Sequence, residues 1–225
     1  MIDEAASLEN FGGILRLFPL PNLVLFPGVV QGLHIFEPRY RQMTAESLAD
    51  DSLLGLVMLK RGWEDDYEDR PPIEEVACLG RISWHEELPD GRYNLRLRGL
   101  ARVKILAELP SPLPYRTARV EILPETGPPS AEELKTFRGK LAEVVLPRFT
   151  DDGDAKRQLE DLFDSEMSLG QVCDVLAYAM PLPAEFKQSM LEEPHAGRRA
   201  AALVDAIRLT AARADRKFPP DFSSN

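Results

Sequence analysis

The sequence predicts an α+β protein in which a β-barrel comes first and an α-helical bundle follows it. In the first half of the chain, short apolar runs alternate with proline and glycine, which is the pattern of successive strands. In the second half, apolar residues recur at helical spacing after a proline-rich segment at residues 124–129. The chain has 225 residues, 44% of them hydrophobic and 28% charged, so it can bury a sizeable core without disulfide bonds.

The first strands are expected where prolines and glycines interrupt apolar sequence, because proline is excluded from the interior positions of a sheet ladder. Pro38 then opens a helix that should end near Asp50, since proline is tolerated in a first helical turn. An acidic, proline-containing stretch at residues 61–75 predicts a long surface loop. The strands expected in this part are Ile14–Phe18, Leu23–Phe26, Val29–Phe36 and Leu53–Leu59.

A β-hairpin is the clearest local prediction. Val76–Trp84 is strand-like, Leu88–Gly91 has turn chemistry, and apolar residues alternate with polar ones from Tyr93 to Arg98. The alternation continues over residues 103–105 and 118–122. Several short strands at regular spacing favour a closed or partly closed barrel, which removes exposed strand edges.

Helices are expected after residue 124. Ser130 and Glu133 have the spacing of a capping box, and Leu141 lies on the apolar face of the helix that follows. We therefore place a barrel domain with one inserted helix at residues 14–124 and a helical domain at residues 125–217, with tails at 1–13 and 218–225. Further helices are expected from Asp154 to Phe163, after Ser168, after Pro183 and from Ala196 to Ala214.

Charge and composition exclude several kinds of partner. The chain carries 27 Lys and Arg against 37 Asp and Glu, a formal net charge of −10, so we expect no nucleic acid partner. Residues 1–4 lack the basic start of a signal peptide, and prolines and glycines within Leu17–Phe36 would break a membrane-spanning helix. Cys78 and Cys173 are isolated thiols that make no disulfide framework, so we expect a cytoplasmic protein without a membrane partner.

Complete catalytic motifs are absent. The sequence contains no G-x-x-x-x-G-K-[ST] loop for nucleotide phosphates and no G-x-S-x-G nucleophile elbow. His85 and Glu86 begin like a zinc-protease motif, but the second histidine position is Pro89, in a turn. We therefore expect no cofactor, no metal and no catalytic residue, although an enzyme of unrecognised type stays open.

The block from His34 to Arg41 is the most distinctive candidate for a binding site. Glu37, Arg39 and Tyr40 could form a recognition surface for a partner. They also fit a structural role at a strand-to-helix corner, in which Glu37 accepts backbone N–H bonds and an arginine pairs with a carboxylate. We favour the structural role, and we expect His34 to be a hydrogen-bonded histidine of the core or its rim.

Three aromatic residues supply the other candidate contacts. Trp63 and Tyr67 stand among acidic residues, where they could anchor a basic or unfolded partner or could lie on a solvated loop. Trp84 lies in a predicted strand, and indole favours half-exposed positions. Because aromatic side chains give much contact area for little rotamer entropy, these three residues are predicted partner contacts.

Three segments resemble a known family. They are LFPLPNLVLFPG at Leu17–Gly28, GLHIFEPRYRQM at Gly32–Met43 and LPDGRYNLRLRGLARVKI at Leu88–Ile105. Lys187-Gln188, followed by Met190-Leu191, gives weaker support. The chain resembles the N-terminal, substrate-binding domain of Lon proteases, especially its free-standing relatives, and the related domain of cereblon. The resemblance implies a PUA-like β-barrel followed by an α-helical domain.

The same resemblance implies a function. We expect a non-catalytic polypeptide-binding or protein-interaction module, without the ATPase and protease domains of Lon. Its partner would be an unfolded polypeptide segment or a dedicated protein, and its oligomeric state is open. Two alternatives remain, an RNA-binding PUA-like protein and an unrecognised enzyme.

Overall fold

The computed structural model describes residue 8 and residues 11–66, 70–127, 130–149 and 153–214. The chain forms two compact units. The first, here called the sheet unit, comprises Met1–Pro124 and Asp174–Pro194, and the second, the helical unit, comprises Glu125–Cys173 and His195–Asn225. This division differs from the single expected boundary at Pro124, because residues 174–194 group with the sheet.

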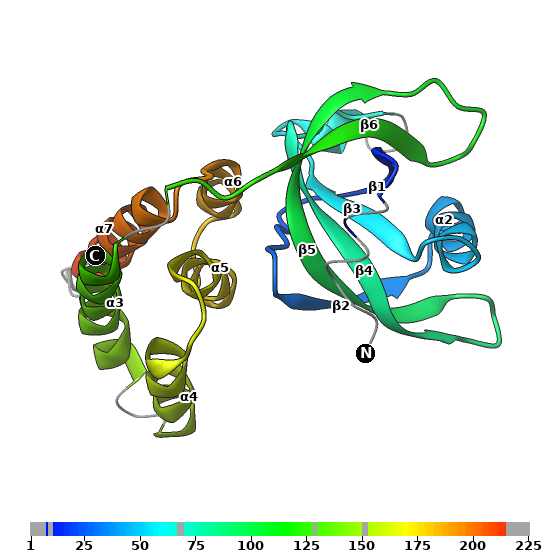
Figure 1. Ribbon diagram of the computed structural model, residues 1–225. Helices are drawn as coiled ribbons and strands as arrows, with labels where there is room; N and C mark the ends of the chain where they lie inside the picture. The colour runs from blue at the N-terminus through cyan, green and yellow to red at the C-terminus, as the bar shows by residue number, and fades with distance from the viewer. Residues whose placement is uncertain (1–7, 9–10, 67–69, 128–129, 150–152, 215–225) are drawn as a thin grey trace, which may run out of the picture. The chain divides into compact units, whose positions relative to one another are not determined.

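The sheet unit is built on one six-stranded sheet of order β2-β5-β4-β3-β1-β6, with an additional pairing of β5 with β6 (Figure 1). The ladder therefore runs from β5 through β4, β3, β1 and β6 and returns to β5. Among the strands of the described residues, only β1 and β3 pair in parallel, and β2 pairs with β5 alone, so β2 keeps an edge that a fully closed sheet would lack. The strands are β1 Ile14–Leu20, β2 Val30–Ile35, β3 Leu53–Met58, β4 Val76–Glu87, β5 Tyr93–Glu108 and β6 Arg116–Leu123.

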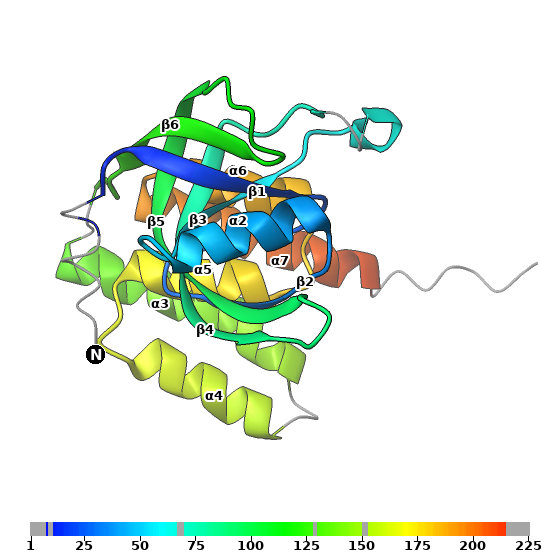
Figure 2. The ribbon, with the colours of Figure 1, turned by 90° about the vertical axis from the view of Figure 1, so that its right-hand side faces the viewer.

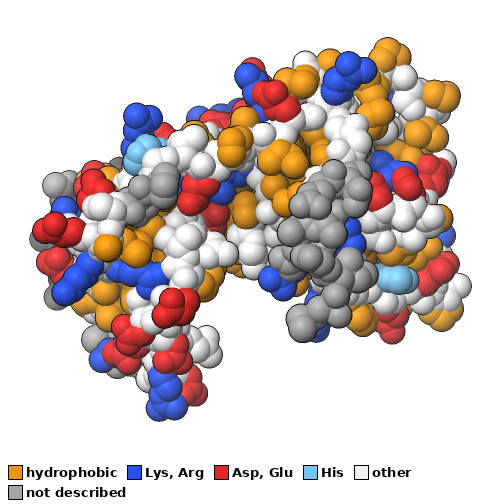
Figure 3. Space-filling view, in the orientation of Figure 1, with side chains coloured by type: hydrophobic (Ala, Val, Ile, Leu, Met, Phe, Trp, Pro, Cys, Tyr) orange, Lys and Arg blue, Asp and Glu red, His pale blue; other side chains and the backbone are white. Residues whose placement is uncertain are grey.

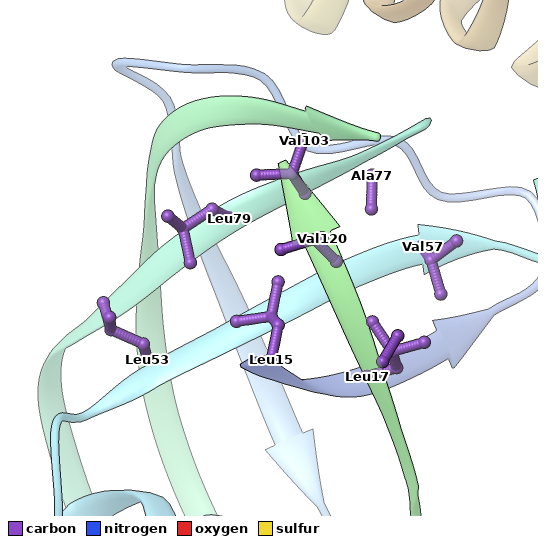
Figure 4. Close-up of a cluster of buried hydrophobic side chains, with 9 residues drawn as sticks. Leu15, Leu17, Leu53, Val57, Ala77, Leu79, Val103 and Val120 are labelled. Carbon is purple, nitrogen blue, oxygen red and sulfur yellow. The ribbon is translucent and has the colours of Figure 1, made fainter. Parts of the chain in front are cut away.

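The core of the sheet unit is apolar. Side chains from β1, β3, β4, β5 and β6 point toward one another and exclude solvent, as Figure 4 shows for nine of them. Leu17, Leu79 and Val103 are fully buried. The side chains reach the core because alternate residues of a strand face the same side, which is the pattern that the sequence shows at residues 93–98 and 118–122.

One expected strand is wrong. Residues 23–26 form no strand, although Val24, Leu25 and Phe26 are buried. The segment packs as a loop against β5 at Gly99, where a Cβ would collide with the Phe26 carbonyl. Backbone bonds join the two segments, from the Gly28 N–H to the Gly99 oxygen (2.9 Å) and from the Gly99 N–H to the Val29 oxygen (2.9 Å). An apolar run can therefore be core without being strand, and the flanking prolines are the signal that it leaves the ladder.

The expected inserted helix is present as α2, Pro38–Leu48, which packs on β1 and β3 of the sheet. Tyr40, Met43, Thr44 and Ser47 form its buried face. The Ser47 hydroxyl donates to the Leu53 carbonyl oxygen (3.1 Å), which satisfies a polar group inside the fold. A short 3-10 turn, Trp63–Asp66, follows β3.

A buried ion pair explains why residues 174–194 belong to the sheet unit. The Arg102 guanidinium on β5 donates to both Asp174 carboxylate oxygens, at 3.0 and 2.6 Å, and to the Leu191 carbonyl oxygen at 2.9 Å. The Gln188 amide on α6, Ala184–Glu192, donates to the Val76 carbonyl oxygen on β4 at 3.0 Å. Sequence separations of 72 to 112 residues hide these contacts from any local pattern.

The helical unit contains α3 Ala131–Val145, the 3-10 turn Leu146–Phe149, α4 Gly153–Asp164, the first turn of α5 and α7 Ala196–Ala214 (Figure 2). The capping box at Ser130 and Glu133 is confirmed. Leu141, Leu203 and Ile207 are fully buried. The division between the two units falls inside α5, Leu169–Ala179, after Cys173.

Two arginines satisfy polar groups within the helical unit. Arg138 of α3 donates to the carbonyl oxygens of Phe163 (2.5 Å), Ser165 (2.9 Å) and Met167 beyond the end of α4. These carbonyls would otherwise lack partners at a helix C-terminus. Arg199 of α7 is fully buried and pairs with Glu125. The α+β class expected from the sequence is confirmed.

Candidate functional site

The sheet unit has a cavity of about 440 Å³, here called the arginine cavity. Within the described part of the chain, its charged lining residues are all arginines, namely Arg39, Arg70 and Arg116. The remaining lining residues are apolar or aromatic: Pro19, Tyr40, Leu59, Pro71, Leu113, Pro114 and Tyr115. Such a mixture of an apolar wall with a few polar groups is what ligand pockets in proteins present.

The first turn of α2 supplies one wall of the arginine cavity. Tyr40 is buried and packs edge-on against Phe18, with 4.6 Å between ring centroids. The Arg39 guanidinium lies 4.8 Å from the Tyr40 ring centroid and pairs with the Glu37 carboxylate, at 2.8 and 2.9 Å. Glu37 is the N-cap of α2, but its side chain makes no capping hydrogen bond.

One expectation for this corner is therefore corrected. The arginine–carboxylate pair is present, whereas the capping hydrogen bond expected of Glu37 is not made by its side chain. Two nitrogens of Arg39 contact the same carboxylate oxygen, Oε2, so charge-assisted contacts with Arg39 hold the Glu37 side chain.

The start of β6 supplies the opposite wall. The Arg116 guanidinium donates to Glu108, at 2.8 Å from its Nε, and to the Pro71 carbonyl oxygen at 2.7 Å. The Tyr115 hydroxyl donates to the Glu46 carboxylate. Burial, and next this hydrogen bond, raises the pKa of Tyr115, while the same bond lowers the pKa of Glu46. Both Tyr115 and Arg116 are thus held in place by carboxylates that do not line the cavity.

Arg70 differs from the other two arginines. It is exposed, and it forms no ion pair with any residue that the structure describes. Its five N–H donors are therefore the ones available to a ligand in the arginine cavity. Neither Arg70 nor Arg116 was among the site residues predicted from the sequence. No local pattern links Arg116 to Arg70 and Pro71, which lie about 45 residues earlier in the chain.

A second hollow of about 320 Å³, here called the tryptophan cavity, adjoins the first because Leu59 lines both. Trp63 is half-buried there beside Met58. Arg61 and Glu185, which also line it, form an exposed ion pair at 2.7 Å. Burial raises the pKa of Glu74 on the same wall. The predicted contact Tyr67 lies outside the described residues.

Trp84 lies on the outer face of β4, in neither cavity. Its side chain is 47% exposed, and the Arg96 guanidinium lies 5.5 Å from its ring centroid. Phe36, 60% exposed at the end of β2, is an exposed aromatic that the sequence interpretation did not select. It stacks on His34, whose Nδ1 lies 2.7 Å from the Asn94 side-chain oxygen. His34 is hydrogen-bonded as expected, but it is exposed on β2 and does not belong to the core.

The structure brings Arg39, Tyr40 and Trp63 onto two adjoining cavities, with Glu37 behind Arg39, and it leaves Trp84 apart. Acidic, basic and apolar side chains are interspersed on the face that Figure 3 presents, over each unit. Among the described residues, no group of three or more His, Cys, Asp or Glu side chains could hold a metal ion. Across the same residues, no helix combines the length and apolarity needed to cross a bilayer.

Comparisons with known proteins agree on one family. A model described as the ATP-dependent protease La (LON) substrate-binding domain matches residues 14–208. Lon protease of Anaeromyxobacter dehalogenans is 27% identical over 187 residues, which are 82% of this chain and 22% of that protein. Lon protease of Parabacteroides distasonis is 32% identical over 147 residues, 64% of this chain and 17% of that protein. The chain therefore spans about a fifth of the length of these relatives.

Solved structures are similar over most of both chains. A Lon N-terminal domain protein from Xanthomonas campestris has a TM-score of 0.63 and 27% identity, over 85% of this chain and 97% of that one. The N-terminal domain of a Mycobacterium avium complex Lon protease has a TM-score of 0.66 at 19% identity, over 87% and 98%, which is a likeness of fold alone.

Proposed function

Because this chain belongs to the family of the ATP-dependent protease La (Lon) substrate-binding domain, we propose that it is a non-catalytic module that binds polypeptides. The observation that carries the proposal is the match of that family over residues 14–208, nearly the whole chain. The bound polypeptide is an unfolded segment or an exposed segment of a dedicated protein partner. Cys78 and Cys173 are both buried as thiols, which fits the reducing conditions of the cytoplasm, the compartment that we propose.

The sheet is proposed to be a PUA-like barrel. The hydrogen-bonded ladder that leaves β5 through β4 and returns to it through β6 supports this assignment. We propose residues 14–124 as the barrel domain and residues 125–217 as the helical domain. Residues 174–194 of the helical domain pack with the barrel, and Asp174 binds Arg102 of β5 there.

The adjoining arginine and tryptophan cavities are the proposed binding surface. Tyr40, Leu59 and Trp63 line their walls, and Trp63, which is half-buried, offers the apolar contact area among them. Arg39, which pairs with Glu37, also lines the first cavity. Tyr67 and Trp84 remain proposed contacts on the ground of their aromatic side chains alone. Binding should be weak, with dissociation constants roughly from micromolar upward, because ordering a flexible chain offsets much of the contact energy.

The two tryptophans allow a direct test. The chain contains only Trp63 and Trp84, so the variant Trp84→Phe reports fluorescence from the tryptophan cavity, and Trp63→Phe reports it from the outer face of β4. Each variant is titrated with a reduced, unfolded model protein that lacks tryptophan, and with the same protein in its native form as control. We expect saturable change in Trp84→Phe with the unfolded form only.

Three other outcomes have clear meanings. A response only in Trp63→Phe would move the binding surface to the outer face of β4. Equal responses to folded and unfolded forms would favour a dedicated folded partner, and no response by fluorescence or calorimetry would reject polypeptide binding. Hydrolysis of unfolded casein or of ATP by the pure chain would contradict the non-catalytic part of the proposal.

One observation favours a second candidate function, the binding of single-stranded RNA. The outer face of β4 and β5 exposes Trp84, Arg96 and Arg98, and bases stack on aromatic and guanidinium groups in such proteins. The test is a mobility shift with labelled single-stranded RNA in the wild type and in Arg96→Gln. RNA binding predicts a shift that weakens steeply from roughly 50 to 200 mM salt and is reduced in the variant.

A further inference from the structure

We propose that the arginine cavity captures the free carboxyl terminus of a polypeptide whose last residue is apolar. The inference rests on the proposed function, which it deepens by naming the part of the polypeptide that enters the cavity. It follows from the charge, the rigidity and the size of the cavity lining.

The charge of the lining opposes the charge of the chain. The chain has a net charge of −10, yet among the described residues every charged side chain that lines this cavity is an arginine. The carboxylates that pair with Arg39 and Arg116, namely Glu37 and Glu108, do not line the cavity. They neutralise two of the three guanidinium groups from behind, so the anion that the cavity selects needs only about one negative charge, as a carboxylate carries.

The donors that face the cavity differ in their freedom. Arg116 is fixed by bonds to Glu108 and to the Pro71 carbonyl, and Arg39 by two bonds to Glu37. Arg70 lies next to Pro71 in sequence, is exposed and pairs with no residue in the described part of the chain. A guanidinium matches a planar carboxylate through two parallel N–H···O bonds, so Arg70 is the group that should close on the ligand.

The remaining wall fits an apolar side chain rather than an inorganic anion. Tyr40, Tyr115, Leu59 and Leu113 line the cavity together with prolines, which offer no side-chain donor. A volume of about 440 Å³ lies within the usual range of pockets that enclose small ligands. A free chain end carries a main-chain carboxylate beside its last side chain, whereas an internal segment has only neutral amides in its backbone, so the terminus is the part of a polypeptide that matches both the arginines and the apolar wall.

The test uses the full chain and one fluorescein-labelled peptide, unfolded and rich in leucine, synthesised with a C-terminal acid and with a C-terminal amide. A third peptide is amidated and carries aspartate at its penultimate position. Affinities are measured by fluorescence anisotropy for the wild type and for Arg70→Gln. Arg157→Gln, an exposed arginine of α4 in the helical unit, is the matched control.

We expect the acid to bind the wild type and Arg157→Gln about tenfold or more tightly than the amide, which corresponds to one charge-assisted pair. In Arg70→Gln the difference in affinity between the acid and the amide should shrink to within about twofold. Removing the guanidinium and removing the carboxylate eliminate the same interaction, so their effects should not add. The aspartate peptide should bind like the simple amide.

Opposite results overturn the inference in distinguishable ways. If acid and amide bind the wild type equally, carboxylate capture is wrong while polypeptide binding stands. If the aspartate peptide matches the acid, the cavity selects side-chain carboxylates instead of a terminus. If the acid–amide difference persists in Arg70→Gln, the carboxylate is held elsewhere, and if no peptide binds at all, the proposed function fails together with this inference.

Discussion

Arg102 of the sheet unit and Arg199 of the helical unit are both buried, but their carboxylate partners differ in exposure. In the sheet unit, Arg102 and Asp174 are both almost inaccessible, with side chains 5% and 3% exposed. In the helical unit, fully buried Arg199 pairs with Glu125, whose side chain is 37% exposed, and Arg138 binds neutral carbonyls. The comparison teaches that the cost of losing a polar partner depends on what is left behind, since a charge left in the dry interior costs more than a carbonyl that water can reach.

The largest expected effect is on the sheet unit. Asp174→Ala should lower the free energy of unfolding by about 3–5 kcal/mol, because it leaves the Arg102 guanidinium buried without its counter-charge. Urea denaturation followed by circular dichroism measures the change. The double variant Arg102→Met, Asp174→Leu is the control, and it should recover much of the loss. A loss under about 1 kcal/mol in Asp174→Ala would mean that water reaches the pair.

Shortening a buried apolar side chain in the helical unit shows the loss of stability that occurs when no charge is involved. Leu141→Ala should cost about 2–5 kcal/mol, because Leu141 is fully buried in α3 and its removal leaves a cavity. Leu209→Ala, at a 64% exposed position of α7, should change stability by no more than about 0.5 kcal/mol. Equal losses in the two variants would contradict the burial of this helix face.

Arg138→Met should have a smaller effect, about 1–3 kcal/mol, because the variant leaves carbonyl oxygens rather than a charge without partners. Arg157→Met on α4, where the arginine is exposed, controls for the change in net charge. Thermal and urea unfolding of both variants give the measurement. A cost as large as that of Asp174→Ala would remove the distinction between the two units.

The smallest expected effect is at the N-terminus of α3. Ser130→Ala should cost about 1 kcal/mol, because the Ser130 hydroxyl accepts the Glu133 N–H. The backbone and the hydroxyl of Ser130 donate to Glu133 and lower the pKa of its carboxyl. A lowered folded pKa gives stability that is present above the unfolded value of 4.5 and is lost as pH falls.

The pH dependence of stability tests the contribution of Glu133 to the capping box separately from that of Ser130. Glu133→Gln should weaken the decline in stability between about pH 5 and pH 3, compared with the wild type. Unfolding curves at those two pH values check the sign. A variant whose decline is steeper than that of the wild type would contradict the lowered pKa of Glu133.

Local patterns in the sequence predicted most of the elements. The capping box at Ser130, the turn before Gly91 and the alternation after Tyr93 depend on neighbours within a few residues, and all three are present. The strand expected at Leu23–Phe26 failed because an apolar run reports burial but not ladder pairing. A backbone contact with Gly99, more than seventy residues away, decides the conformation there.

Fewer features of the candidate site than of the fold could be predicted from the sequence. Arg39, Tyr40 and Trp63 were selected by residue type, and they line the two adjoining cavities. Arg70 and Arg116 meet only because β6 returns to the neighbourhood of the loop before β4, a distance of 45 residues between Arg116 and Pro71. No spacing rule can join such residues before the chain topology is known.

The path of the chain between the two units has a consequence for cleavage. The boundaries after Pro124, Cys173 and Pro194 mean that the backbone passes from one unit to the other three times. A single cut between Pro124 and Glu125 would leave one fragment with β1 to β6 and another that still carries Asp174, whose carboxylate Arg102 binds. The nicked protein should therefore migrate as one particle in native conditions, and the two pieces should reassemble with second-order kinetics after dilution from urea. Each piece lacks a partner that the other piece carries, so the two pieces are not independent domains.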